Sequence, residues 1–479
     1  MKSNYYKRAA LLVALLLTIS SFGFAQKKAK PAPTLIQERN IRASMDFLAG
    51  DAMQGRGSGT QFEWITGQYF ASLMQQFGIE PAGEKDVSGK PTYIQTVNIT
   101  RDTFAEAPKL NYSANASSIT LEHGKEMLIL RMTTGQVNGG LQKITGEEKP
   151  KQGAIVFLKA KEGEDQRALS QRMQTLSSGG ANAVLVEETP QFRAQWAGLA
   201  ARRIYFTTVA NQARNVMNLV VISKAAADAL SQVADGTNIE IKGNLTESQK
   251  QQTWNAVGKI TGSDPKLSSE VILLSAHMDH LGVRANAPGD DKIFNGADDD
   301  ASGCIAVLEL ARVLAGGAKP KRTIYFAFFG SEEAGGVGSQ YFVNTLTFPK
   351  EKIAANLQFE MIGRPDPKVK PEELWLTGYD RSNLGAELAK RGAKLVADPH
   401  PQQNFFQRSD NYTLARQGVI AHTVSSYDAV NGTYYHKASD EIKTIDFQHM
   451  TRAINSMVAP VRWLVNSNFK PVWYEGKKP

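Results

Sequence analysis

Five short segments in the second half of the chain carry side chains that can bind a divalent metal. They are SAHMDHLG (275–282), NGADDDASG (295–303), GSEEAGGVGS (330–339), NLQFEMIG (356–363) and TYYHKASDEI (433–442). Imidazoles and carboxylates without thiolates suit zinc, with manganese or cobalt as substitutes. Two such ions about 3.5–4 Å apart can polarise a carbonyl and activate water. The pattern therefore predicts a two-metal hydrolase.

The first segment offers His277 at the end of an apolar run. A neutral imidazole in that position is a good zinc ligand. Asp279 lies two residues on and faces the same side of an extended chain, so we expect its carboxylate to hold the second ring nitrogen of His277. His280 faces the other way and is expected to be structural or peripheral.

The second segment places three acids just before an apolar helix. Adjacent carboxylates repel one another unless a cation offsets the repulsion. Asp300 can cap the helix, but capping does not require the other two acids. We predict that Asp299 bridges two metals and that Asp298 faces solvent.

The other three segments complete the predicted site. Glu332 and Glu333 follow the apolar run TIYFAFFG, and we assign the first as general base and the second as metal ligand. Glu360 stands alone in an apolar run, where a carboxylate needs a partner, and His436 supplies the second imidazole. The predicted sets are His277, Asp299 and Glu360 for one ion, and Asp299, Glu333 and His436 for the other.

Alternating apolar strands and helices can position these residues. The buried strands are expected at Val271–Ala276, Thr323–Phe329, Ile353–Ile362 and Gly418–Val424, and the helices at Ser302–Leu314 and Phe447–Val465. Such alternation predicts an α/β fold with helices on both faces of a largely parallel sheet. The candidate ligands follow the carboxyl ends of the strands, where α/β proteins bind ligands.

Residues 115–250 have a different pattern, with short strand candidates and polar helices such as Glu164–Leu176. No cluster with metal-ligand spacing occurs there, which predicts a small inserted domain. The expected organisation is a signal peptide (1–25), a leader with the first part of the catalytic domain (26–114), the insert (115–250) and the main catalytic domain (251–479).

The first 25 residues resemble a secretory signal. Lys2, Lys7 and Arg8 precede an apolar run, and cleavage is expected after Ala25. An uncleaved anchor is the alternative, although the run is short for a membrane span. We expect export to the periplasm or the medium, and no stable membrane span after signal removal.

Composition narrows the possible partners. The chain has 479 residues, of which 42% are hydrophobic, and its net charge of +8 falls to +5 without Lys2, Lys7 and Arg8. This mild, dispersed excess argues against nucleic-acid binding. The single cysteine, Cys304, excludes an internal disulfide and is expected to be a buried packing residue.

Taken together, the segments resemble the co-catalytic zinc aminopeptidases of peptidase family M28. The run LAGDAMQGRGSGT…YFASLMQQFGIEPAG resembles the family's N-terminal stretch, and RSDNYTLARQGVIA (408–421) resembles a late segment. The insert, with QGAIVFLKA and GGANAVLVEE, resembles a protease-associated (PA) domain. The resemblance implies a three-layer α/β/α domain around a mixed sheet, with the insert either near the cleft, limiting substrate size, or a passive decoration.

The resemblance also assigns roles. It implies the same five ligands, the same general base and a zinc-bridging hydroxide as the nucleophile. It adds Tyr435 as a residue that helps to stabilise the tetrahedral intermediate, and a cis peptide between Asp299 and Asp300. Two positions depart from the family: Glu360 replaces the commoner aspartate, and Asn411 replaces a histidine found in many members.

The resulting hypothesis is an exported two-zinc exopeptidase, an aminopeptidase acting on peptides. A carboxypeptidase would need a cation for the substrate's terminal carboxylate, for which Arg364 and Arg408 are candidates. A glutaminyl cyclase would typically use one zinc, and a peptide-binding protein on an inactive scaffold would be expected to lack ligands. The preferred N-terminal residue and the oligomeric state stay open.

Overall fold

The computed structural model describes residues 35–479 except 147, 160, 162–168, 170–171, 174–175, 177–179, 202–203, 210–217 and 247. The expected signal peptide, the basic leader up to residue 34 and most of the expected helix Glu164–Leu176 lie outside the described residues. In the described part of the chain, no helix has the length and apolar character needed to cross a bilayer.

A ten-stranded mixed sheet forms the centre of the larger lobe. Its order is β19 (Leu395–Ala397), β18 (Leu374–Leu376), β20 (Ala421–Ser425), β17 (Ile353–Phe359), β13 (Val271–His277), β16 (Thr323–Phe329), β12 (Gln249–Ile260), β2 (Ile94–Thr103) and β9 (Tyr205–Val209), with β1 (Glu80–Pro81) paired to β12. Strand β13 is parallel to β16 and β17, and β17 is parallel to β20, whereas the pairings from β16 outward through β9 are antiparallel. Every residue of β13, β16 and β17 is buried, as expected for central parallel strands.

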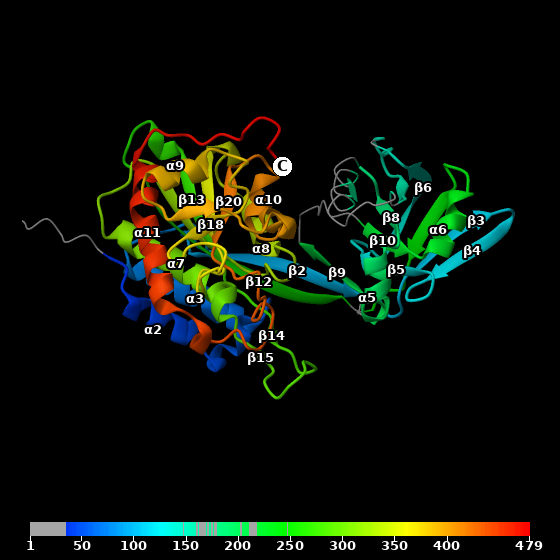
Figure 1. The fold of residues 1–479 in the computed structure, drawn as a ribbon, viewed down its shortest axis with the longest axis horizontal. Helices are drawn as coiled ribbons and strands as arrows, with labels where there is room; N and C mark the ends of the chain where they lie inside the picture. Colours follow the sequence, from blue (N-terminus) through cyan, green and yellow to red (C-terminus); the bar gives the residue numbers. More distant parts are fainter. Residues whose placement is uncertain are drawn as a thin grey trace, which may run out of the picture.

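Helices cover both faces of this sheet. Successive strand residues point to opposite faces, so both faces carry apolar side chains that pack against helices. Ile272 and Leu274 pack in one core, and Leu273 and Phe329 pack in the other. The first core includes α2 (Glu38–Leu48), α3 (Gln61–Gln76), α7 (Gly303–Ala315), α9 (Leu384–Lys390) and α11 (Phe447–Asn466), and the second includes α8 (Val337–Asn344) and α10 (Asn411–Ala415). The predicted three-layer α/β/α arrangement is therefore present (Figure 1).

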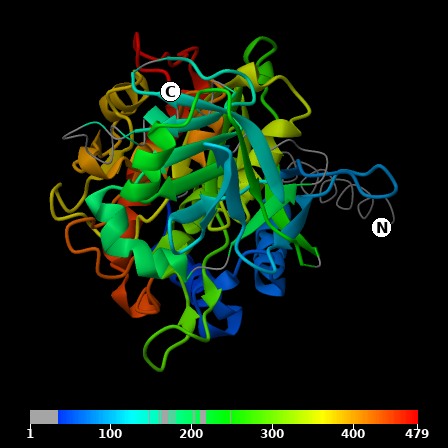
Figure 2. The same ribbon diagram turned by 90° about the vertical axis from the view of Figure 1, so that its right-hand side faces the viewer.

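A smaller lobe contains a second sheet, of eight strands. Their order is β4 (Ser117–Glu122), β3 (Lys109–Ala114), β11 (Asn238–Lys242), β6 (Gln136–Ile144), β7 (Ile155–Leu158), β8 (Ala183–Glu187), β10 (Asn218–Ile222) and β5 (Met127–Arg131), accompanied by α5 (Pro190–Ala200) and α6 (Lys224–Ser231). Strands β2, β9 and β12 run between the lobes in Figure 1, and Figure 2 views the molecule from the side of the smaller lobe. Strand β9 lies within residues 115–250 but pairs with β2 in the larger sheet.

Short elements complete the larger lobe. They are β14 (Gly282–Val283), β15 (Ile293–Phe294), η1 (Asp51–Arg56), η2 (Leu267–Ser269), η3 (Ala297–Ser302), η4 (Lys350–Lys352), η5 (Pro401–Gln403), η6 (Phe405–Gln407) and η7 (Ile442–Thr444). The glycine-rich loop GDAMQGRGSGT contains the six-residue element η1, which is interrupted by left-handed residues at Gln54 and Gly55.

Candidate metal centre

The candidate ligands meet at the carboxyl edge of the parallel strands. His277 is the last residue of β13 and pairs in register with Phe329, the last residue of β16. Glu360 directly follows β17. Segments that are far apart in sequence therefore converge because parallel strands end at one edge of the sheet.

The first cluster consists of His277, Asp299 and Glu360. One ligand atom from each lies within 4.8 Å of the other two. His277 Nε2 is 3.1 Å from Asp299 Oδ1. This is the set predicted for the first ion.

The second cluster forms around Asp299 and Glu333 and contains two histidines. His436 Nε2 lies 3.1 Å from Glu333 Oε1 and 3.4 Å from Asp299 Oδ2. His280 Nδ1 lies 3.0 Å and 3.7 Å from the same two atoms. Of the two roles expected for His280, structural or peripheral, the peripheral one was wrong, because the chain turns after His277 and carries this ring into the site.

Several buried atoms of these clusters lack a hydrogen-bond partner. They are Asp299 Oδ2, Glu333 Oε1, Glu360 Oε2 and both ring nitrogens of His280. Buried polar atoms are normally paired, because an unsatisfied one costs free energy. His280 Nδ1 is close to Glu333 Oε1 but is not aligned for a hydrogen bond. Lone pairs that converge without donors are what a cation site requires, so these residues fit a metal.

The electrostatics of the clusters agree with this fit. Burial raises the pKa of Glu360 to about 7 and that of Glu332 well above its ordinary value, and neighbouring acids add to both shifts. Burial opposes the ionisation of Asp299, but the adjacent histidines hold its pKa well below the ordinary value. A cation would offset both the burial and the repulsion that raise the pKa values of Glu332 and Glu360.

Asp279 positions the two adjacent glutamates. Its carboxylate accepts hydrogen bonds from the backbone N–H of Glu332 at 2.9 Å and of Glu333 at 3.3 Å, and from Ser58 Oγ at 2.5 Å. The His277 ring nitrogen Nδ1 instead lies 3.2 Å from the backbone carbonyl of Asp279, with the carboxylate 3.8 Å away. The expected carboxylate–imidazole hydrogen bond is thus replaced by a carbonyl contact, and the carboxylate fixes the following loop.

The acids on either side of Asp299 hold the surrounding loops. Asp300 accepts hydrogen bonds from the backbone N–H groups of His277, Gly303 and Met361. The Asp299–Asp300 peptide is cis, as the family resemblance implied. Asp300 therefore joins the segments that carry the three candidate ligands of the first cluster.

Asp298 is only 1% exposed, so the prediction that it faces solvent was wrong. Its carboxylate accepts hydrogen bonds from Gly363 N at 2.7 Å and from Arg364 Nη1 at 2.9 Å. Arg364 also donates to Asp440, whose carboxylate accepts the backbone N–H of Asp299. The guanidinium of Arg364 offsets the negative charge of Asp298, so this carboxylate can be buried away from water.

Sequence reasoning overlooked Arg56. This residue is 1% exposed and donates to the carbonyls of Leu48, Met278, Asn295 and Gly296 at 2.6–3.0 Å. It thus joins the loop after β13 to the loop before Asp299. The only available signal was an arginine in a glycine-rich loop, which does not identify distant carbonyl partners.

The remaining predicted residues also have defined places. Tyr435 stacks on His436 with ring centroids 3.8 Å apart. Asn411 is fully buried. Its side-chain amide donates to Phe406 O and accepts from Thr423 Oγ1, so it links neighbouring segments of the core. Cys304 is buried, as expected.

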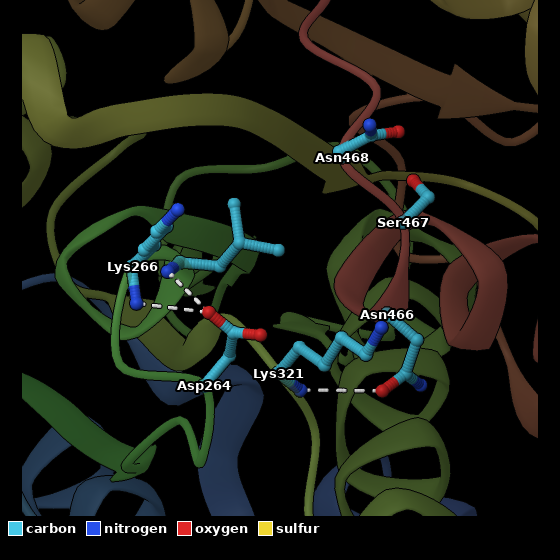
Figure 3. A pocket seen from close by; sticks show the side chains of 7 residues that line it. Asp264, Lys266, Lys321, Asn466, Ser467 and Asn468 are labelled. Carbon is cyan, nitrogen blue, oxygen red and sulfur yellow. Dashed lines mark hydrogen bonds between the residues drawn. The ribbon is translucent and has the colours of Figure 1, made fainter.

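A separate hollow of about 490 Å³ lies near the opposite edge of the sheet. It is lined by Asp264, Lys266, Leu267, Lys321, Asn466, Ser467 and Asn468. Asp264 accepts the backbone N–H of Lys266 and of Leu267, and Lys321 N donates to Asn466 (Figure 3). Oxygens of Asp264 and Asn466 in the hollow thus already accept local hydrogen bonds. None of the candidate metal ligands lines the hollow.

Comparison with known proteins agrees with this geometry. Residues 255–461 match the model of peptidase family M28. This segment is a peptidase family M28 domain. It extends from β12 into α11 and includes all five ligand-bearing segments, so the M28 match covers the whole candidate metal centre.

Individual relatives match shorter parts. Leupeptin-inactivating enzyme 1 from Streptomyces exfoliatus is 31% identical over 146 residues, which is 30% of this chain and 30% of that protein. An aminopeptidase from Pseudomonas aeruginosa (strain UCBPP-PA14) is 36% identical over 121 residues, 25% of this chain and 20% of that protein. The chain thus spans less than a third of the length of either curated relative.

One solved structure shows the fold over most of the chain. An aminopeptidase from Aneurinibacillus sp. strain AM-1 superposes with a TM-score of 0.52 at 17% identity, covering 90% of this chain and 95% of that one. The M28 domain and the smaller lobe therefore occur together in a fold that is similar to a known one.

Proposed function

We propose that the chain is an exported, zinc-dependent aminopeptidase that binds two ions. The observation that carries this proposal is the convergence of two ligand clusters on one shared carboxylate, Asp299. His277 and Glu360 would complete one site, and Glu333 and His436 the other. When bound, zinc supplies a Lewis acid that polarises a carbonyl and lowers the pKa of water.

The roles of the protein's own groups follow from their positions. The Glu332 carboxylate accepts a proton from the attacking water and returns it to the leaving amine nitrogen. Glu332 is suited to this role because Asp279 holds its backbone beside the clusters while no hydrogen bond of the described residues occupies its carboxylate. The acids Glu332 and Glu360 would also attract the ammonium group of a peptide N-terminus. Tyr435, beside His436, would stabilise the oxyanion.

Two parts of the proposal concern the whole protein. Residues 1–25 would direct export and then be removed. The smaller lobe would be a PA-type domain, inserted over roughly residues 115–250, that limits the length of peptide reaching the site. A catalytically inactive peptide-binding protein is less well supported, because the side chains of all five candidate ligands gather around Asp299.

Metal removal tests the proposal directly. The purified protein should hydrolyse leucine p-nitroanilide and should contain about two zinc ions per chain. Chelation should abolish turnover, and added zinc should restore it. An N-acetylated analogue should not be cleaved, because it lacks the ammonium group. Cleavage of the blocked substrate at a similar rate would contradict an aminopeptidase.

The roles of the two histidines of the second cluster can be distinguished by measuring the zinc bound to a variant of each. We expect His436→Ala to lower bound zinc from about two ions to one, because His436 Nε2 is close to both Glu333 and Asp299. His280→Ala should retain two ions at excess zinc, with an affinity weakened about 10–100-fold, as for loss of a group that supports a ligand. Zinc titration with a competing chelator measures both. The reverse pattern would assign the ligand role to His280.

A further inference from the structure

An exposed arginine stands beside the metal centre. Arg408 follows η6, and its Nη2 donates to Tyr435 Oη at 3.3 Å. Its guanidinium carbon lies 5.0 Å from the ring centroid of Phe405 and 5.5 Å from that of Tyr435. Since Tyr435 stacks on His436, only one ring separates this cation from a predicted zinc ligand.

The arginine rests on a group of rings that we call the aromatic wall, made of Phe405, Tyr427 and Tyr435. Tyr427 contacts both other rings, with centroids 5.8 Å from Phe405 and 5.6 Å from Tyr435. Phe405 is 9% exposed, so the wall is anchored in the fold. The guanidinium is therefore held in place by ring contacts.

Arg408 has free hydrogen-bonding capacity. Among the described residues, no carboxylate lies within ion-pair distance of its guanidinium, whose one hydrogen bond is donated to Tyr435 Oη. Stacking uses the flat faces of a guanidinium and leaves the N–H groups at its edge available. Arg364, the other arginine considered as a partner for a substrate carboxylate, is buried and bonded to Asp298 and Asp440. Arg408 is therefore the available carboxylate-binding group of the two.

We propose that Arg408 binds a substrate carboxylate on the leaving side of the scissile bond, which makes short, carboxylate-bearing peptides the preferred substrates. This inference rests on the proposed aminopeptidase function. Glu332 and Glu360 attract the ammonium end of a peptide and repel its carboxylate, whereas Arg408 attracts the carboxylate in a two-pronged hydrogen bond. The carboxylate can come from the C-terminus of a dipeptide or from an acidic second side chain.

Matched peptide pairs test the inference. The ratio of kcat/KM for Leu-Gly over Leu-Gly-amide reports the terminal carboxylate, and the ratio for Leu-Asp-amide over Leu-Asn-amide reports the side chain. We expect at least one ratio to be about tenfold or more in the wild type, because hydrogen bonds to charged groups are worth about 1.5–3 kcal/mol. Arg408→Gln should bring that ratio to within about twofold of one, and Arg408→Lys should retain part of it.

Arg391→Gln is the matched control. Arg391 is also exposed and also stacks on a ring, with its guanidinium carbon 4.6 Å from the Trp463 centroid, but it lies at the end of α9. Both ratios should stay at their wild-type values in this variant. Equal losses in the two variants would overturn the assignment to Arg408.

Binding supplies a readout that does not need turnover. In a Glu332→Gln background loaded with zinc, calorimetry should show tighter binding of the carboxylate peptide than of its amide, and Arg408→Gln should remove the difference. Wild-type ratios near one, or ratios that Arg408→Gln leaves unchanged, would overturn this inference while leaving the aminopeptidase proposal intact. Absence of hydrolysis together with an Arg408-dependent binding difference would overturn only the proposed function.

Discussion

Glu332→Gln should lower kcat by about 10²–10⁴-fold, the usual contribution of a positioned general base. Glutamine keeps the shape of the side chain but cannot accept the proton from water. The backbone of residue 332 would still donate to Asp279, so the loop that carries Glu333 should keep its position. The variant should bind two zinc ions and unfold at the wild-type temperature. Steady-state kinetics, metal analysis and thermal unfolding measure these three properties.

Glu351→Gln is the control for removal of a glutamate charge. Glu351 is exposed in η4, so this variant should match the wild type in all three measurements. Two outcomes at position 332 would contradict the assigned role. A kcat within about fivefold of wild type is below the usual range for a general base. Loss of one zinc ion would instead make Glu332 a ligand.

The positions of the main candidate ligands in the fold could be predicted from sequence because they depend on local patterns. His277, Glu333 and Glu360 each end or follow an unbroken apolar run, and such runs are the central strands of this fold. Parallel strands then bring their carboxyl ends to one edge, whatever the length of the connections. This reasoning needed no knowledge of the contacts between distant side chains.

The errors arose where the chain leaves regular structure. The argument about Asp279 and His280 assumed an extended chain beyond His277, but β13 ends there, and His280 N donates to Arg56 O. The alternation of side chains then no longer applies. Asp298 was misplaced because its buried partner, Arg364, is 66 residues away. Sequence alone supplies no distance for such a pair.

Arg56→Met should destabilise the protein by at least about 3 kcal/mol, because four buried carbonyls lose its guanidinium and only that of Gly296 keeps another donor, the Ala301 N–H; each unsatisfied carbonyl costs about 1–3 kcal/mol before relaxation. Two of these carbonyls belong to Met278 and Gly296, close in sequence to His277 and Asp299. Without Arg56, the loops that carry Met278 and Gly296 should position His277 and Asp299 less firmly. Zinc affinity should therefore fall together with stability.

Arg322→Met distinguishes this effect from general destabilisation. Arg322 is also fully buried and donates to the carbonyls of Leu464, Ser467 and Phe469, as well as to Glu270, but it precedes β16 at the edge opposite the metal centre. Both variants should unfold at lower denaturant concentration. The stabilisation by added zinc depends on the ratio of its concentration to the dissociation constant, so it should shrink in Arg56→Met and persist in Arg322→Met. An equal zinc response in the two variants would show that Arg56 supports only the fold, because losing its four carbonyl contacts would then act like losing the three carbonyl contacts and one carboxylate contact of Arg322 at the opposite edge of the sheet.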